Sequence, residues 1–137
     1  MPGTATEQAT QDTLSRFFGC FAAGDSAGML DLFAEDCDFE VAGSPTVPWT
    51  GRREAPEQFK EFIRAATEDV VTQEFDIRLT VIDGENVVVL GRFAHQVKAT
   101  GKIFRGPFSL HVRVVDGMIA TYRMYEDSYA AHLAFSD

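Results

Sequence analysis

The periodicity of the apolar residues changes after Asp69, and this change constrains the fold more than any other feature of the sequence. Before Asp69, apolar side chains recur with the helical period of about 3.6 residues, and after it they alternate with polar ones. The alternating segments span about 71–82, 87–98, 104–115 and 118–127. Helices followed by an antiparallel meander are typical of an α+β domain whose helices cover one sheet face.

The part of the chain before Asp69 predicts three helices. The first runs from about Glu7 to Ala23 and stops at Gly24, a residue that favours the left-handed conformation found after helices. Asp25 suits the cap of a short second helix, and Pro56 suits the first turn of the third. The apolar stripes of these helices are Leu14, Phe17, Phe18 and Phe21; Met29, Leu30 and Phe33; and Phe59, Phe62, Ile63 and Ala66.

Shorter elements complete the expected fold. The alternating stretch 38–41 predicts a strand, and the segment 43–51, with two prolines and the only tryptophan, predicts a rigid loop. A short helix is expected to start near Ser128. Turns are expected at 83–86, 99–103 and 116–117.

The length and charge of the chain limit its class. A chain of 137 residues fits one domain, and we expect residues 1–6 to form a disordered tail and residues 7–137 a single domain. The net charge of −9 argues against a nucleic acid or an anionic membrane surface as partner. The sequence has no apolar run of roughly 20 residues and no signal-like start, so we expect a cytoplasmic protein.

The sequence offers no sign of a metal or a cofactor. Cys20 and Cys37 lack metal-ligand spacing and sit among apolar neighbours, which is typical of buried free thiols in a reducing compartment. No cluster of His, Asp and Glu shares one face of a predicted element, and no glycine-rich phosphate loop follows a strand. We therefore expect neither a metal site nor a cofactor.

The turns predict which side chains lie opposite one another. A four-residue turn at 83–86 would pair Leu79 with Leu90 and Ile77 with Arg92. The odd-numbered residues of the first long strand and the even-numbered residues of the second then share the inner face.

The last hairpin is read in the same way. A two-residue turn at 116–117 would place Leu110 opposite Arg123 and Phe108 opposite Tyr125. Joining the two hairpins through the turn at 99–103 brings Arg92 beside Leu110. A bulge would invert these faces.

On this reading, an apolar concave face carries a group of polar side chains at one end. The expected apolar residues are Phe75, Ile77, Leu79, Leu90, Phe108, Leu110 and Val112, and the polar ones are Arg92, Arg123, Tyr125 and Asp127. Buried charges are unfavourable unless they are paired or used, so this convergence predicts a small-molecule site. Phe17, Phe21 and Trp49 are expected to add further walls to it.

The opposite sheet face is also rich in apolar residues, and we expect it to form a two-fold dimer interface. His95 and His111 are assigned to this outer face. Its expected apolar residues are Val89, Phe93, Val97, Val115, Met118, Tyr122 and Met124.

Five short motifs extend over most of the chain: FAAGD (21–25), FAED (33–36), GRREA (51–55), VDGMI (115–119) and RMYED (123–127). In this order and spacing the sequence resembles the SnoaL-like polyketide cyclases, within the superfamily of ketosteroid isomerase and nuclear transport factor 2. The resemblance implies a cone-shaped barrel in which three N-terminal helices pack on a strongly curved, mixed, mostly antiparallel sheet. Enzymes and non-enzymes share this fold.

The resemblance also implies site residues. In the cyclases an Asp of the last strand acts as general acid/base, and Asp127 matches it. A His found in many relatives falls at Leu110 here. The epoxide hydrolases of the superfamily use an Asp-Arg-Asp set, of which Arg92 and Asp127 match two members and Ala94 replaces the third. The base of the isomerases would fall at Val41 or Ala42.

The preferred hypothesis is a cofactor-independent acid/base enzyme, of cyclase or isomerase type, acting on a hydrophobic polyketide-like or other oxygenated cyclic molecule. Asp127 would move a proton, Arg92 would stabilise an enolate or bind a carboxylate, and Tyr125 would donate a hydrogen bond. Arg123 would support Asp127. Asp127 could instead be a structural ion-pair partner or the cap of the last helix. The alternatives are a ligand-binding or scaffold protein of the same fold, and an enzyme resembling the epoxide hydrolases.

Overall fold

The structure, a computed structural model, describes residues 4–136. Its elements are α1 (Ala5–Ala23), α2 (Ser26–Asp31), β1 (Phe33–Val41), β2 (Gly51–Arg53), α3 (Pro56–Glu68), β3 (Val70–Asp83), β4 (Asn86–Val97), β5 (Ile103–Val115), β6 (Met118–Glu126) and α4 (Ser128–Phe135). None of these helices is long and apolar enough to cross a membrane.

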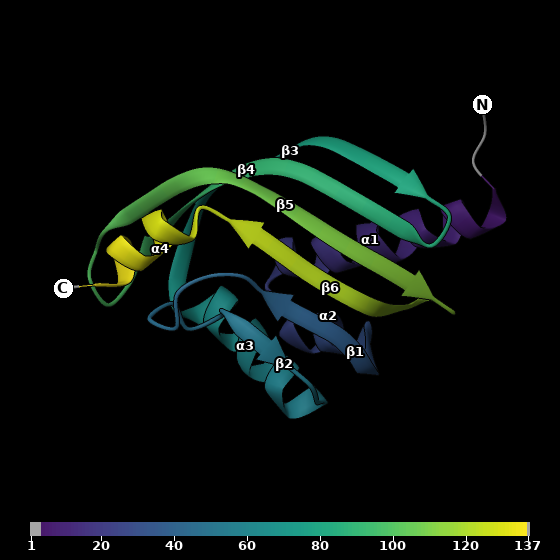
Figure 1. The fold of residues 1–137 in the computed structure, drawn as a ribbon, viewed down its shortest axis with the longest axis horizontal. Helices are drawn as coiled ribbons and strands as arrows, with labels where there is room; N and C mark the ends of the chain where they lie inside the picture. The colour runs from purple at the N-terminus through teal and green to yellow at the C-terminus, as the bar shows by residue number, and fades with distance from the viewer. Residues whose placement is uncertain (1–3, 137) are drawn as a thin grey trace.

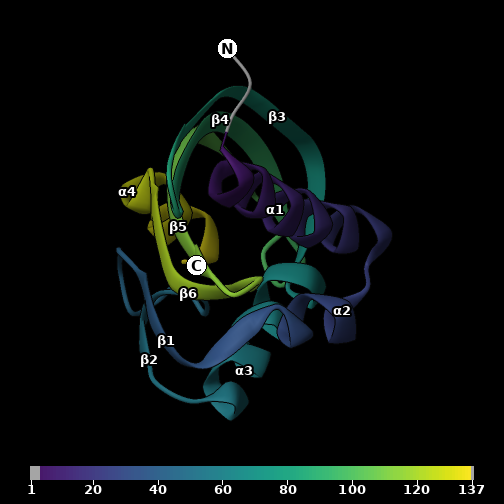
Figure 2. The same cartoon turned by 90° about the vertical axis from the view of Figure 1, so that its right-hand side faces the viewer.

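One sheet of six strands forms the body of the molecule, in the order β2-β1-β6-β5-β4-β3. Strands β1 and β6 run parallel and the other neighbours antiparallel. The long strands lie side by side and bend strongly (Figure 1), and seen end-on the sheet curls around α1 without closing, with α2 and α3 at its open side (Figure 2). The predicted α+β cone with a mixed, mostly antiparallel sheet is confirmed.

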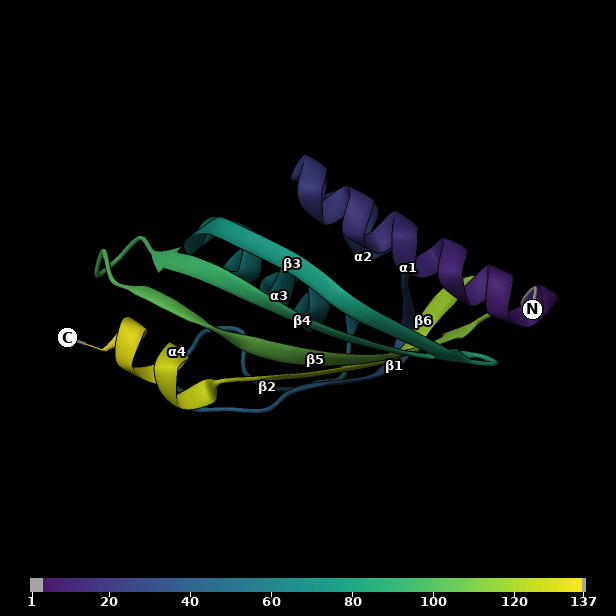
Figure 3. The ribbon, with the colours of Figure 1, turned by 90° about the horizontal axis from the view of Figure 1, so that it is seen from above.

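Helix α1 runs along one side of the sheet, whereas α4 follows the end of β6 and lies beside the far end of β5 (Figure 3). A capping box starts α1: the Thr4 hydroxyl accepts from the Glu7 amide at 3.0 Å, and the Glu7 carboxylate accepts from the Thr4 amide at 3.1 Å. Gly24, with φ of 70°, ends the helix. We predicted a disordered tail over residues 1–6. This prediction is wrong for residues 4–6, which cap and begin α1. Residues 1–3 lie outside the part of the chain that the structure describes.

Strand β1 begins earlier than the sequence indicated. Phe33, expected in the second helix, opens the strand and lies opposite Ile119 of β6. Its ring packs against Phe17 and Phe59 at 5.8 and 5.6 Å, so tertiary packing in the aromatic core outweighs the local helical spacing. The short strand β2 pairs with the end of β1 and was expected only as loop and helix start.

A bulge in β3 changes the predicted faces of the first long hairpin. Leu79 lies opposite Leu90, as predicted, but the register shifts between Ile77 and Leu79. Arg92 therefore lies opposite Asp76 instead of Ile77. One extra residue in a strand moves every later side chain to the other face.

A second bulge has the same effect on the last hairpin. The register shifts between Arg113 and Val114, so that Leu110 lies opposite Met124 and Phe108 opposite Glu126. The predicted partners, Arg123 and Tyr125, are each one residue away. Even-numbered residues of β6 therefore face the helices.

The pairing of β4 with β5 also differs from the prediction. Leu110 lies beside Val89, and Arg92 lies beside Pro107. The odd-numbered residues of β4 are therefore the inward ones, and they are buried: Val87, Val89, Gly91, Phe93, His95 and Val97. Of the predicted inner face, Ile77, Leu79 and Leu90 are instead exposed, by 41%, 51% and 41%.

Most of the residues assigned to the outer face are consequently buried, so they cannot form the expected dimer interface. His95 belongs to this buried group. The exposed apolar residues of the sheet include Leu79, Val81, Leu90 and Tyr125. Leu79 pairs directly with Leu90, and such a patch on paired strands is unfavourable in water. The dimer stays a prediction, and we now expect its interface to include these exposed side chains.

We predict that light scattering will give about twice the chain mass of 15.1 kDa, because a second copy would cover the Leu79–Leu90 patch. Leu90→Arg should give the monomer mass. Leu133→Arg, which alters an exposed leucine of α4, should leave the dimer intact. A wild-type monomer at micromolar concentration would contradict the prediction.

Two glycine substitutions should have opposite effects on the free energy of unfolding. At Gly91 an added Cβ would lie 2.4 Å from the Asp76 carbonyl oxygen and 2.7 Å from the Phe108 ring. Gly91→Ala should destabilise by roughly 1–3 kcal/mol through overpacking. Gly19 lies within α1 with open space around it, and Gly19→Ala should stabilise by roughly 0.5–1 kcal/mol. Urea denaturation of both variants checks the signs.

Candidate functional site

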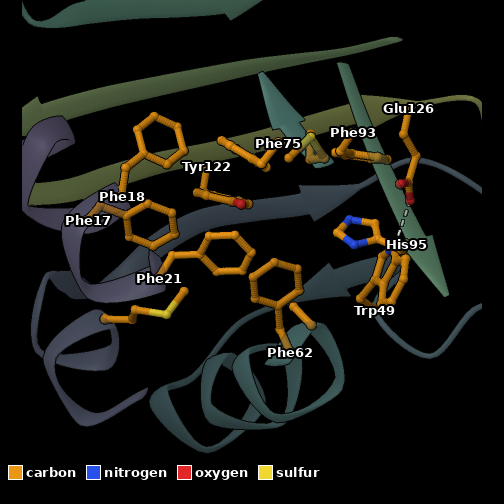
Figure 4. A pocket seen from close by; sticks show the side chains of 13 residues that line it. Phe17, Phe18, Phe21, Trp49, Phe62, Phe75, Phe93, His95, Tyr122 and Glu126 are labelled. Carbon is orange, nitrogen blue, oxygen red and sulfur yellow. Dashed lines mark hydrogen bonds between the residues drawn. The ribbon is translucent and has the colours of Figure 1, made fainter. Parts of the chain in front are cut away.

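A cavity lies between the helices and the concave face of the sheet (Figure 4). Its empty volume is about 590 Å³, including the space open to solvent at its mouth. Most of its walls are aromatic or apolar side chains. They are Phe17, Phe18, Phe21, Met29, Trp49, Phe62, Ala66, Phe75, Phe93, His95, Tyr122, Met124 and Glu126.

The carboxyl group of Glu126 enters this cavity from the end of β6. The Trp49 indole Nε1 donates a hydrogen bond of 2.5 Å to Oε1 of Glu126. Burial among apolar groups raises the pKa of Glu126 to about 7, the charge of Asp127 adds to this rise, and the Trp49 hydrogen bond opposes it. Both the protonated and the ionised form are therefore populated near neutral pH.

His95 lies near Glu126 and Trp49 at the same end of the cavity (Figure 4). Its ring is 7% exposed and packs 4.4 Å from the ring of Phe93. Nδ1 shares a 3.0 Å hydrogen bond with the Thr72 hydroxyl of β3. Burial lowers the pKa of His95 to about 4, so its imidazole is uncharged at neutral pH.

Tyr122 is the third polar residue of the lining. It is buried, and its ring stacks on Phe39 at 4.8 Å. Burial and the nearby negative charge of Glu126 raise the pKa of Tyr122 above its ordinary value. The phenol therefore keeps its proton and can serve as a neutral hydrogen-bond donor.

These groups form one titrating carboxyl and two neutral hydrogen-bonding groups in an aromatic enclosure. Such a carboxyl can take a proton from a ligand and return it, because its pKa is close to the working pH. Across residues 4–136, no group of three or more His, Cys, Asp or Glu residues could hold a metal ion. The available chemistry of the described cavity is proton transfer and hydrogen bonding.

Asp127, the predicted acid/base group, lies outside the lining of this cavity. Its side chain accepts a 3.0 Å hydrogen bond from the Ala130 amide and caps α4. The residue is exposed and borders a shallow groove on the outer side of the sheet. The geometry thus matches the capping role weighed for Asp127 in the sequence.

The structure places Arg92 and Tyr125 on the same outer groove. Tyr125 is 48% exposed. No ion pair within 4.0 Å joins Arg92 to Asp127 in the described part of the chain. We expected a direct or one-water contact between these two residues at the open end of an apolar cavity; the direct ion pair is not formed, and both residues border the outer groove instead.

Arg123 belongs to a surface ion-pair network between β1 and β6. Its guanidinium lies 2.9 Å from Asp38 and 3.4 Å from Glu40. Arg52 of β2 also pairs with Asp38, at 3.0 Å. The Arg123 guanidinium holds the pKa of Asp38 below its usual value, and the arrangement ties three neighbouring strands together.

The residues predicted to bind substrate divide into two groups. Phe17, Phe21 and Trp49 line the cavity, and their contact with a substrate stays a prediction. Phe108 is absent from this lining: it is buried, stacks on Phe93 with ring centres 5.1 Å apart and borders the outer groove. Leu110 is fully buried in the core.

Sequence reasoning missed Glu126 and His95. A signal for both was present: in β4 the odd-numbered set is mostly apolar, whereas the even-numbered set contains Arg92 and Gln96. Choosing the more apolar set as the inner one would have turned His95 inward. Glu126 follows Tyr122 and Met124 in steps of two.

Comparison with known proteins agrees with the fold. The family described as SnoaL-like domain matches residues 14–122, most of the chain. The chain belongs to this SnoaL-like family. The comparison with curated proteins finds no match.

Three solved structures illustrate the range of proteins with this SnoaL-like fold. An NTF2-like protein of Burkholderia xenovorans LB400 is 25% identical, with TM-score 0.82 over 95% of this chain and 98% of that one. A protein of Jannaschia sp. CCS1 assigned as a SnoaL-like polyketide cyclase is 18% identical, with TM-score 0.82 over 99% and 97%. An LEH-like epoxide hydrolase of M. tuberculosis is 17% identical, with TM-score 0.73 over 94% and 90%.

Trp49 is the only tryptophan of the chain, so its fluorescence reports on Glu126 directly. We predict an emission change with a midpoint near pH 7, where the bonded carboxyl ionises. Glu126→Gln should abolish this transition and Asp127→Asn should preserve it. Emission that stays constant between about pH 5 and about pH 9, or a transition that survives in Glu126→Gln, would contradict the prediction.

Proposed function

We propose that this SnoaL-like protein is a cofactor-independent acid/base enzyme, of isomerase or cyclase type, in which Glu126 moves the proton. Its substrate is a hydrophobic cyclic molecule that carries a carbonyl group. The proposal keeps the reaction class expected from the sequence and transfers the central role from Asp127 to Glu126.

The observation that carries the proposal is the buried carboxyl of Glu126 at the wall of an aromatic cavity. A carboxylate in water, with its pKa near 4, is a weak base, whereas burial raises the pKa of Glu126 to about 7. Trp49 occupies Oε1 and fixes the orientation of the group. Raised basicity and fixed orientation are what general-base catalysis at neutral pH requires.

The reaction would begin with a carbon-bound proton next to the substrate carbonyl. The Glu126 carboxylate takes this proton and becomes a carboxylic acid, while the C–H electron pair forms an enolate. In an isomerisation, Glu126 returns the proton to another carbon of the same conjugated system. In a cyclisation, the enolate carbon attacks a second carbonyl of the same molecule and Glu126 protonates the resulting alkoxide. His95 and Tyr122 line the same cavity and would hydrogen-bond to the substrate oxygens.

The relatives support the class of reaction without fixing it. Proteins assigned as an isomerase and as a polyketide cyclase share the fold at 19% and 18% identity. The alternative of an epoxide hydrolase has less support, because Arg92 borders the outer groove and is absent from the lining of the cavity. A binding protein without activity remains the second candidate, since the same aromatic enclosure would hold a flat apolar ligand.

Deuterium exchange tests the proposal without knowledge of the natural substrate. β-Tetralone is a flat bicyclic ketone with acidic α-hydrogens, and NMR in heavy water follows their loss. Wild-type protein should accelerate the exchange, with a rate that rises with pH to a plateau above about 7, because only ionised Glu126 is a base. Glu126→Gln should lower the protein-dependent rate by roughly 10²–10⁴-fold.

The matched control is Asp127→Asn, which changes the neighbouring carboxylate that caps α4. It should retain most of the exchange rate and change the melting temperature little, because Asn caps a helix about as well as Asp. An exchange rate that is equal in wild type and Glu126→Gln would refute the proposed role. The binding-protein alternative would then be preferred.

A further inference from the structure

Two of the three polar side chains that line the cavity lie at one end of it. Glu126 and His95 lie near Trp49, whereas Phe17, Phe18 and Phe21 of α1 form the opposite apolar wall (Figure 4). Among the described residues of the lining, none is a lysine or an arginine. A bound ligand therefore meets two hydrogen-bonding groups at one end and, apart from the Tyr122 phenol, hydrocarbon along the rest of its length.

His95 has one ring nitrogen in use and one available. Nδ1 is engaged by the Thr72 hydroxyl, and Nε2 has no hydrogen-bond partner within residues 4–136. The rings of Phe93 and Trp49, centred 4.4 and 6.1 Å away, restrict rotation of the imidazole. Thr72 on the edge strand β3 thus positions the ring, and Nε2 is left for a ligand.

The aromatic lining disfavours charged ligands. An anion would enter a low-dielectric space beside the Glu126 carboxylate with no lining cation to compensate it. A cation would lose its hydration shell on entering, and a buried ion pair with Glu126 can return less free energy than this desolvation costs. A hydroxyl or carbonyl oxygen needs no counter-charge and can bond to both groups.

We infer that His95, positioned by Thr72, is a second polar contact of the ligand beside Glu126, and that the two restrict the cavity to uncharged planar molecules with a hydroxyl or carbonyl group at one end. This inference rests on the proposed function only because it uses the same cavity and the same carboxyl group. It adds a ligand-binding residue, a positioning residue and a charge preference.

Equilibrium dialysis of matched bicyclic probes tests the inference at about pH 8, where Glu126 is mostly ionised. The probes are β-naphthol, its carboxylate analogue β-naphthoate, the cation naphthylmethylammonium, and methylnaphthalene, which has no polar group. Wild-type protein should bind β-naphthol most tightly, at least tenfold more tightly than β-naphthoate, since like charges would share an apolar site.

Variants separate the two polar contacts. His95→Phe should weaken β-naphthol binding by roughly 3- to 10-fold, the range for one lost hydrogen bond, and leave methylnaphthalene binding little changed. Thr72→Val keeps the imidazole and should cause a smaller loss for β-naphthol alone. Thr80→Val, at an exposed position of the same strand, is the control and should bind every probe like wild type. Glu126→Gln should bind β-naphthoate more tightly than wild type does, because the variant lacks the like charge of the Glu126 carboxylate.

His95→Gln serves as a second variant if His95→Phe does not fold, and it should lie between His95→Phe and wild type. The inference is overturned if β-naphthoate or the cation binds wild type as tightly as β-naphthol, if β-naphthol does not bind, or if both Thr72→Val and the folded His95 variant bind it like wild type. A failure of the proposed function is distinguishable, because it would show as unchanged deuterium exchange in Glu126→Gln with these binding preferences intact.

Discussion

A carboxyl group among aromatic rings needs a hydrogen-bond donor, and Trp49 supplies it to Glu126. This contact links the loop before β2 to the last residue of β6 across 77 positions of the sequence. Trp49 is held in turn by the edge contact of its ring with Phe135 of α4, 5.2 Å away. Asp127, the residue next to Glu126, caps α4. It therefore stabilises the helix against which Trp49, the hydrogen-bond donor to Glu126, packs.

The bulge between Arg113 and Val114 decides which carboxylate enters the cavity. With a regular ladder, Tyr125 and Asp127 would face the helices, and Glu126 would face solvent. With the bulge, Tyr122, Met124 and Glu126 face inward. A single extra residue in β6, Ala120, therefore decides which of two different sites forms on the same fold.

The fold could be predicted from the sequence because its main elements agree with their local patterns. The stripes of α1 and α3, the alternation after Asp69 and the turn at Asp116–Gly117 all predict what the structure shows. The site could not, because it depends on the register of three strand pairs. Bulges shift the β3–β4 and β5–β6 pairs without a strong signal in the sequence, and the turn at 99–103 sets the regular β4–β5 pair. The buried Phe93 and His95 of β4, beside the outward Arg92, carried the available clue.

The site combines a carboxyl that is destabilised by burial with neighbours that cannot neutralise it. Arg123, the arginine of β6, is engaged by Asp38 and Glu40 on the surface, and Arg92 borders the outer groove. The Glu126 pKa is therefore raised by desolvation without a nearby cation in the lining to lower it again. Such a perturbed group in a cleft is what proton-transfer sites use.

The most direct test of this account is the pKa of Glu126 itself. Carbon-13 NMR of the side-chain carboxyl carbons, assigned by the signal that disappears in Glu126→Gln, measures it without any ligand. The account predicts a midpoint near pH 7 for Glu126, far above the ordinary value of 4.5. A midpoint near 4.5 would show that the carboxyl is solvated, and would contradict the central claim that Glu126 is the proton-transfer group of this cavity.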